Sequence, residues 1–176
     1  MAEPLRPNSV GTFGKTNWIF VTTLANKSAP SVAEVNATSG LDISRIIFAS
    51  SGKPSQSTNR VTNERRLGDT KVYERIGVSN VTGGTMTYAF DPQAASGSDG
   101  KKWFEKIPEG ASGFLIERKG IARATAPAAG QFVNVYPVEF GPSFPTDSGA
   151  EESAESAMTV EFSIPNEVAI NVAIAA

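Results

Sequence analysis

The chain has 176 residues, a formal net charge of −2 and a pI near 5.3. This length predicts one compact domain with a real hydrophobic core, and the charge supplies no general basic field that could hold a phosphate backbone. Cysteine and histidine are both absent, which excludes disulfides, thiolate nucleophiles, structural zinc sites and the most common general base. We therefore expect neither a dedicated nucleic-acid-binding protein nor a histidine- or cysteine-dependent enzyme.

Residues 1–14 contain two prolines, two glycines and few apolar side chains, which predicts an extended N-terminal arm. The arm has no signal-peptide pattern and no stretch of the chain reaches membrane-spanning length, so we expect a protein kept in the cytoplasm unless a larger particle carries it out. Residues 15–176 are expected to form a single β-rich domain. The arm either frays or docks onto a neighbouring copy, and its candidate contact residues are Leu5, Val10 and Phe13.

The first strand is predicted over residues 17–24, where apolar side chains point to both faces, as in a central strand covered on both sides. Residues 32–36 predict a weaker strand. Residues 40–48 fit either a strand or a short helical turn, and their periodicity does not decide between the two.

The segment at about 49–70 differs from the rest of the chain because it begins with a loop composition and continues with charged residues on both alternating faces. A strand in a compact core needs one apolar face, so this segment is predicted to project as a long loop or hairpin. It would either be a flexible surface loop or meet a complementary surface on an identical copy. The candidate subunit-interface residues are Arg60, Glu64, Arg65, Arg66 and Asp69.

The body of the domain is predicted to resume with a strand marked by Val72, Ile76 and Val78, followed by a turn at 81–84. The next strand, residues 85–90, places Met86, Tyr88 and Phe90 on one face. A single short helix is predicted over residues 100–107, capped by Ser98 or Asp99. Its apolar stripe consists of Trp103, Phe104 and Ile107.

The C-terminal third predicts further strands. Residues 114–118 form one, and 120–130 a small-residue loop or an edge strand. Residues 131–140 change their apolar face near Tyr136, beside Pro137, which indicates a bulge or an edge strand. An acidic, serine-rich loop is expected at 141–157. Two cleanly alternating segments, 158–164 and 168–174, then predict a C-terminal hairpin that turns at Pro165 and Asn166.

Candidate catalytic groups are few. Asp91 with Asp99, and Glu151 with Glu152, are the nearest carboxylate pairs along the sequence, but all four lie in segments where solvated carboxylates are expected. The chain contains no phosphate-binding glycine loop, no nucleophile elbow and no calcium loop. We predict a protein that is not an enzyme and that needs no metal or cofactor.

The order of these elements resembles that of the major tail tube proteins of long-tailed (siphovirus-type) bacteriophages. The resemblance rests on an opening arm, the aromatic strand at 18–21, GLDISRIIF at 40–48, the long charged loop, and GGTMTYAF ending in Asp91-Pro92. It continues with the lone helix GKKWFEKI, the strand QFVNVYPVEFG, a long loop and the final segments MTVEFSIPNEVAINVAI. The resemblance implies a β-sandwich or barrel with one short flanking helix.

The resemblance further implies a structural virion protein, six copies of which form a ring, with rings stacked into a helical tube that conducts DNA into the host. Its partners would be other copies of itself and the tail tip or baseplate, tape measure and tail terminator proteins. DNA would pass without specific binding. The protein would be assembled in the bacterial cytoplasm and reside in the virion tail. The alternative is a β-sandwich carbohydrate- or receptor-binding module, whose aromatic candidates are Trp18, Trp103, Tyr73 and Tyr136.

Overall fold

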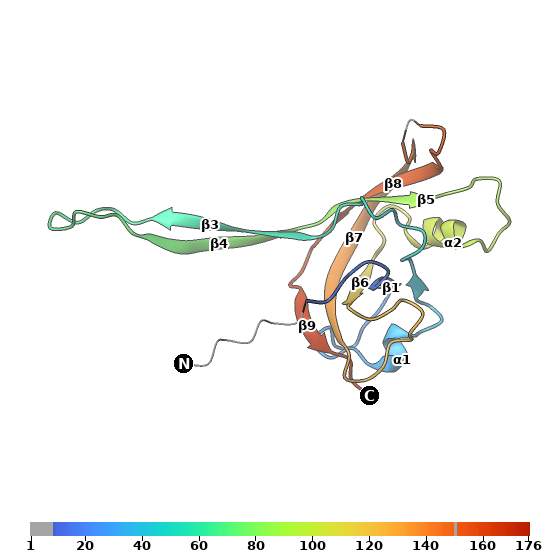
Figure 1. Cartoon of the computed structure of the whole chain (residues 1–176), viewed down its shortest axis with the longest axis horizontal. Helices are drawn as coiled ribbons and strands as arrows, with labels where there is room; N and C mark the ends of the chain where they lie inside the picture. Colours follow the sequence, from blue (N-terminus) through green and yellow to red (C-terminus); the bar gives the residue numbers. More distant parts are fainter. Residues whose placement is uncertain (1–8, 150) are drawn as a thin grey trace.

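The computed structural model describes residues 9–149 and 151–176 and is mainly β, with 43% strand and 7% helix (Figure 1). A curled antiparallel sheet forms a half-barrel, which confirms the predicted mainly-β class. The order of the main sheet is β2-β1-β6-β7-β8-β5, with β9 added to β7, and β3 and β4 form a separate two-stranded sheet. The bounds are β1 Thr16–Val21, α1 Val32–Val35, β2 Leu41–Asp42, β3 Ser55–Thr62, β4 Glu74–Thr82, β5 Gly84–Ala89, α2 Asp99–Lys106, β6 Ser112–Lys119, β7 Phe132–Asp147, β8 Ser156–Ser163 and β9 Ala169–Ala173.

β1 is a central strand covered on both faces, as predicted. Trp18 and Phe20 enter one hydrophobic cluster, and Ile19 and Val21 enter a second on the opposite face. The strand lies between β2 and β6, so its backbone groups are paired on both sides as well. A run of apolar residues without alternation is stable here because neither face of the strand meets water.

The larger cluster is an aromatic core built around Trp103 of α2, which is fully buried. Its indole ring meets Phe20 edge-on at 5.3 Å and Phe140 at 5.5 Å between ring centroids. The helix was predicted in the right place, but the burial predicted for Phe104 is wrong. This side chain is 41% exposed, and its ring lies beside Phe90 at 5.2 Å between centroids. Because eight residues of helix are marginal alone, Trp103 is what attaches α2 to the sheet.

β7 carries the change of buried face that the sequence shows at Tyr136, but without a bulge at that point. Its pairing with β6 is continuous through Pro137, which lies opposite Phe114. Val133 and Val135 face the smaller cluster, whereas Val138 and Phe140 face the aromatic one. The strand crosses from one core layer to the other. The predicted irregularity is present in this segment, but it lies between Val133 and Val135 in the pairing with β9 rather than at Tyr136.

Pro137 is tolerated inside this sheet because of how the neighbouring strands share β7. On the edge away from β6, β9 pairs with β7 as far as Val135 and β8 begins to pair at Glu139. Pro137 therefore lies in the gap between two ladders, where its missing N–H costs no strand-to-strand hydrogen bond. The register shifts of β7 occur on either side of this gap, between 133 and 135 and between 140 and 143.

Residues 32–36 were predicted as a strand and are instead the short helix α1. Ser31 and Glu34 form a capping box: the Glu34 N–H donates to Ser31 Oγ at 3.3 Å, and the Ser31 N–H donates to Glu34 Oε2 at 2.8 Å. The Glu34 carboxylate also accepts from the Ala25 N–H at 2.6 Å. Two valines favour a strand by propensity, but the reciprocal cap and the burial of Val35 favour one turn of helix.

The C-terminal hairpin is also wrong, although both of its strands exist. β8 pairs with β7 and β5, and β9 pairs with β7, so the two strands do not pair with each other. The loop expected at 141–157 is shorter as well, because β7 continues to Asp147 and β8 begins at Ser156. Residues 40–48 contain only the two-residue strand β2 followed by turns, and no strand is assigned within 120–130.

Candidate functional site

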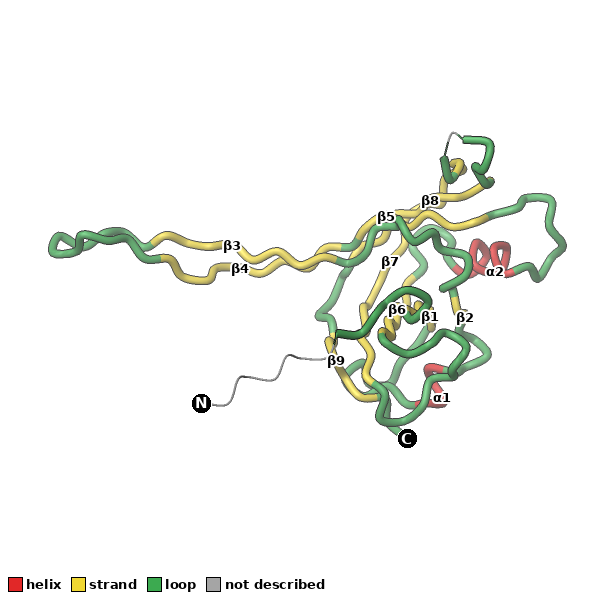
Figure 2. The backbone as a smooth tube through the Cα atoms, in the orientation of Figure 1, coloured by secondary structure: helices red, strands yellow, loops and turns green. Residues whose placement is uncertain are grey.

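The feature that sets this molecule apart is the hairpin of β3 and β4, which extends far from the body (Figure 2). Every residue of β3 is exposed, and β4 is exposed except at half-buried Gly77 and Val81. The two strands pair from Ser55 opposite Thr82 to Thr62 opposite Glu74, with one irregularity between Thr58 and Arg60. The expected strand of the body at Val72–Val78 is therefore wrong, because these residues form the returning arm of the projection.

Large apolar side chains lie on this hairpin without cover. Ile76 is 72% exposed, Val78 68% and Leu67, in the loop at the tip, 97%. No extensive contact joins β3 or β4 to another described helix or strand. An isolated two-stranded hairpin is only marginally stable in water, and a row of exposed branched side chains adds to that cost. In a single copy, the hairpin therefore lies apart from the body with these apolar side chains exposed.

The base of the hairpin is fixed by glycines packed against the sheet. β4 passes into β5 through Gly83, where an added Cβ would lie 1.8 Å from the carbonyl oxygen of Phe162. On the other arm, a Cβ at Gly52 would lie 2.9 Å from the carbonyl oxygen of Thr85. These close approaches are possible only for glycine. The hairpin thus leaves the body as a direct continuation of the sheet.

The structure brings four of the five predicted interface residues together at the hairpin tip. Glu64, Arg65, Arg66 and Asp69 line a shared hollow in the loop between β3 and β4. Arg65 Nη1 donates to the Asp69 carbonyl oxygen at 2.7 Å. Arg60 lies on β3 itself, with its Nη1 3.9 Å from Glu74 Oε2, and both side chains are largely exposed. An exposed pair of this kind contributes little to the stability of a single copy.

The described part of the N-terminal arm is exposed. Val10 is 61% exposed and Phe13 is fully exposed, whereas Leu5 lies outside the described residues. The arm is attached where the Lys15 N–H donates to the Thr12 carbonyl at 2.9 Å and the Gly120 N–H donates to the Lys15 carbonyl at 2.8 Å. An exposed phenylalanine beside a fixed attachment is compatible with the predicted contact role.

Charge is distributed unevenly between the hairpin tip and the C-terminal third. Between residues 60 and 75 the chain has five basic and three acidic side chains, whereas from residue 124 to the C-terminus it has no lysine or arginine. The same C-terminal stretch contains seven carboxylate side chains. The two regions thus have opposite net charge, which the total of −2 conceals. Surfaces of opposite sign on one chain can attract each other between copies.

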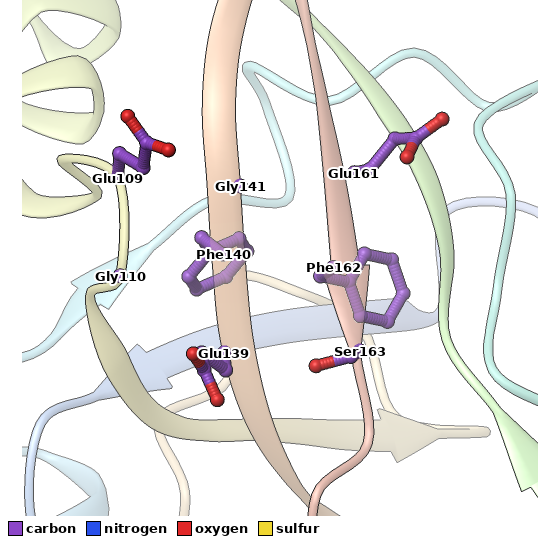
Figure 3. Close-up of a pocket in the computed structure, with 8 residues that line it drawn as sticks. All are labelled: Glu109, Gly110, Glu139, Phe140, Gly141, Glu161, Phe162 and Ser163. Atoms are coloured by element: carbon purple, nitrogen blue, oxygen red, sulfur yellow. The ribbon is translucent and has the colours of Figure 1, made fainter.

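Three glutamates surround a hollow on the exposed face of the sheet (Figure 3). Glu109 follows α2, Glu139 lies on β7 and Glu161 on β8, and the floor consists mainly of the backbone around Phe140 and Phe162. Figure 3 shows the three carboxylates pointing in different directions rather than toward one point. They are arranged as a solvated acidic surface and not as a convergent acid–base pair.

The other candidates for chemistry are equally dispersed. Asp91, Asp99, Glu151 and Glu152 are all exposed, and no group of three potential ligand side chains within 9–149 and 151–176 could hold a metal ion. Of the four aromatic candidates for a sugar platform, Trp18 and Trp103 are buried in the core. Tyr136 stacks on Trp18 at 5.8 Å, which leaves only Tyr73 exposed.

A buried polar network in the body was not anticipated from the sequence. Glu117 is buried between Lys119, whose Nζ lies 3.0 Å away, and Asn134 Nδ2, which donates at 3.0 Å. Tyr136 Oη donates to the same carboxylate at 3.3 Å, and burial together with the Glu117 charge raises the pKa of Tyr136 to about 12. Neighbouring Arg118 is also buried, and desolvation lowers its pKa. Its guanidinium donates to Gln131 Oε1 at 2.8 Å and to the Thr125 carbonyl, which holds the 120–130 loop against the sheet.

The described residues thus form a well-packed β body from which a long hairpin with exposed apolar side chains projects, and its carboxylates do not converge on one point. The family model for phage tail tube proteins matches residues 4–176, and the chain belongs to this family. It is therefore a structural component of a bacteriophage tail tube. No curated protein matches the chain. Neither described helix has the length and apolar composition needed to cross a bilayer.

Proposed function

We propose that six copies of this chain form a ring, that rings stack into a hollow tube through the β3–β4 hairpin, and that DNA passes through the tube into the host. The observation that carries the stacking role is the uncovered hairpin, with Leu67, Ile76 and Val78 exposed and its base fixed by Gly52 and Gly83. A two-stranded hairpin is marginally stable by itself, and covering its exposed apolar side chains with another molecule would stabilise it.

The conduction role is supported by the exposed face of β5, β7 and β8. Cross-strand partners on this face include Thr85 with Glu161, Thr87 with Thr159 and Glu139 with Ser163. The three strands contain no lysine or arginine. A channel wall that offers hydroxyls and carboxylates repels phosphates and releases no counterions on contact, so DNA can slide along it. We propose that this face lines the channel.

The stacking role is tested by removing the hairpin at a point that the register defines. Thr58 lies opposite Ser79, and their hydroxyl oxygens are 2.9 Å apart. Replacing residues 58–79 with Asn-Gly joins Ser57 to Asn80 by a two-residue hairpin turn. The shortened chain should stay folded, as circular dichroism measures. It should form no tubes in negative-stain microscopy, under conditions in which the wild type forms rings and tubes. Tubes of normal diameter from the shortened chain would refute the role.

The channel assignment is tested separately in assembled tubes. Because the chain has no cysteine, Glu161→Cys introduces a single thiol. A small maleimide should label this thiol in tubes, whereas a maleimide coupled to a long polyethylene glycol should not enter. A matched control, Lys102→Cys on the exposed surface of α2, should react with both reagents. Equal labelling of the two variants by the large reagent would place this face outside the channel.

The remaining partners and the site of assembly stay proposals of the same kind. Tail tip or baseplate, tape measure and tail terminator proteins would contact the two ends and the interior of the tube, and assembly would take place in the host cytoplasm. Co-expression with a tail tip complex should shorten the lag before tubes appear. Tubes of unchanged lag and unregulated length would contradict templated growth.

A further inference from the structure

A hollow at the end of β5 lies opposite the hairpin along the same strand path. Only Gly83 separates β4 from β5, so one nearly continuous strand runs from the hairpin through the body (Figure 1). Where that path ends, Phe90 lines a pocket of about 320 Å³ together with parts of β7 and β8. We call this pocket the end hollow; its lining residues are Phe90, Pro92, Pro145, Thr146, Asp147, Ser156, Ala157 and Met158.

The end hollow has an apolar floor and a carboxylate rim. Phe90, Pro145 and Met158 supply the floor, and exposed Asp147 lies in its wall with exposed Asp91 next to Phe90. The loop that joins its two strands adds three exposed glutamates, Glu151, Glu152 and Glu155. The nearby lysines of α2 interact with groups close to them in sequence. Lys102 Nζ lies 3.8 Å from Asp99 Oδ1, and Lys101 Nζ donates to the Ala94 carbonyl.

The hairpin tip has the complementary character. Leu67 projects with 97% of its surface exposed, and Arg65 and Arg66 precede it directly in the sequence. An apolar side chain flanked by guanidinium groups matches an apolar floor flanked by carboxylates. The tip of a copy does not reach its own end hollow, because the hairpin extends from one side of the body and β5, beside whose end the hollow lies, runs to the other side (Figure 1).

We propose that the hairpin tip of one copy docks in the end hollow of the next copy, with Leu67 on the floor and Arg65 and Arg66 facing the carboxylate rim. This inference rests on the proposed stacking function and names the surface that receives the hairpin. The contact is heterologous, so each copy offers one tip and one hollow. Such a contact repeats either around a ring or along an axis, and the proposed stacking of rings corresponds to repetition along the axis.

Two other hollows are less suited to receive the tip. The pocket beside Trp18 and Met86 is apolar, but Lys53 and Arg123 line it and would repel the basic tip. The glutamate hollow of Figure 3 has the right charge, but polar surface makes up the larger part of its lining, whereas apolar surface predominates in the end hollow. Only the end hollow combines both properties among these three.

A disulfide cross-link tests the contact directly in the cysteine-free chain. In tubes of the double variant Leu67→Cys/Thr146→Cys, mild oxidation should produce a ladder of dimers, trimers and longer covalent chains on non-reducing gels. A matched pair, Leu67→Cys/Glu167→Cys, uses an exposed residue outside the end hollow and should give no ladder. Normal tubes without a ladder from the first pair, or a ladder from the second pair, would overturn the docking site while leaving the tube function intact.

A charge exchange provides a second readout. Arg65→Glu/Arg66→Glu should reduce the rate of tube formation roughly tenfold or more, because like charges would then face each other across the contact. Adding Asp91→Lys/Asp147→Lys to the same chain should restore assembly. Restoration by lysines at Glu139 and Glu161 instead would assign the tip to the glutamate hollow. If the wild type forms neither rings nor tubes, the proposed function fails, and this inference fails with it.

Discussion

β4 and β5 follow each other along one strand path, yet their apolar residues meet opposite environments. In β5, Met86 and Tyr88 are buried at 2% and 0% exposure, whereas in β4 Ile76 and Val78 are 72% and 68% exposed. Both segments are rich in residues that favour strands. The difference lies in what covers them, because β5 packs over the aromatic core and β4 has no covering layer in a single copy.

This contrast shows that strand propensity and burial are separable in an assembling protein. A strand whose apolar residues serve an interface resembles a core strand in sequence, because the partner supplies the missing layer after assembly. The two regions should then respond oppositely to mutation. Core substitutions should lower the stability of the free subunit, and hairpin substitutions should spare it while weakening polymerisation.

The largest expected difference in subunit stability is between Trp103→Ala and Ile76→Ala. Removing the fully buried indole leaves a cavity among Phe20, Tyr88 and Phe140 and should cost about 3–5 kcal/mol of unfolding free energy. Ile76→Ala should change it by less than about 0.5 kcal/mol. Urea unfolding of the unassembled protein measures both. Similar losses from the two variants would mean that the hairpin is already packed in the free subunit.

A second test concerns the base of the hairpin. Gly83→Ala would place a Cβ against the Phe162 carbonyl and should cost about 1–3 kcal/mol, because the backbone of β5 or β8 must shift. Gly68→Ala, at the hairpin tip where nothing lies within 4 Å, is the matched control and should be neutral. The measurement is the midpoint of thermal unfolding of the free subunit. Equal midpoints for both variants would show that the backbone at Gly83 can shift to accommodate a Cβ without loss of stability.

The sequence predicts best the elements whose apolar pattern matches their burial, which is a continuous run in β1 and an alternation in β5. Both strands are predicted correctly because their apolar side chains are buried within a single copy. The projecting hairpin is also foreseen in part, since charges on both faces exclude a core position for residues near Arg60. Its return strand was predicted as a strand but assigned to the body, because Ile76 and Val78 alternate as in a buried strand.

Pairing partners could not be predicted from local turns. Pro165 and Asn166 connect two segments that both form strands, as predicted. However, β8 and β9 each pair with β7, which is long enough to pair with β9 before Pro137 and with β8 after it. The candidate site shows the same limit. The charged tip is contiguous in sequence and was predicted, whereas the end hollow combines Phe90, Pro145 and Met158 from distant segments and only the fold reveals it.

A smaller effect is expected at the cap of α1, within the body. Ser31→Ala removes the capping oxygen and should cost about 1 kcal/mol. Hydrogen bonds from Ala25 and Ser31 lower the pKa of Glu34 below its usual value, so this carboxylate stabilises the fold above its unfolded pKa and loses that contribution as the pH falls through its folded pKa. Urea unfolding should therefore show Ser31→Ala below the wild type at neutral pH, and acidification through the folded pKa of Glu34 should weaken both, because the backbone donors of Ala25 and Ser31 remain in the variant. Ser28→Ala, at an exposed serine nearby, is the control and should match the wild type at neutral and acidic pH.

The smallest effect at neutral pH is expected at Tyr136, a tyrosine of the body, because its contribution changes only at alkaline pH; exposed Tyr73 of the hairpin provides the comparison. Burial and the Glu117 carboxylate raise the Tyr136 pKa to about 12, whereas an unfolded tyrosine titrates near pH ~10. Between these values the unfolded chain releases a proton that the folded chain keeps, so stability is intact below pH ~10 and falls as the pH rises toward 12.

Tyr136→Phe should flatten this alkaline loss of stability, and Tyr73→Phe is the matched control because 63% of that side chain is exposed on the hairpin. Urea unfolding midpoints followed from neutral to alkaline pH provide the slope for each variant. An unchanged slope in Tyr136→Phe would mean that other groups dominate alkaline unfolding. A flattened slope in Tyr73→Phe would instead place the hairpin tyrosine in a buried contact before assembly, contrary to the separation between the two regions.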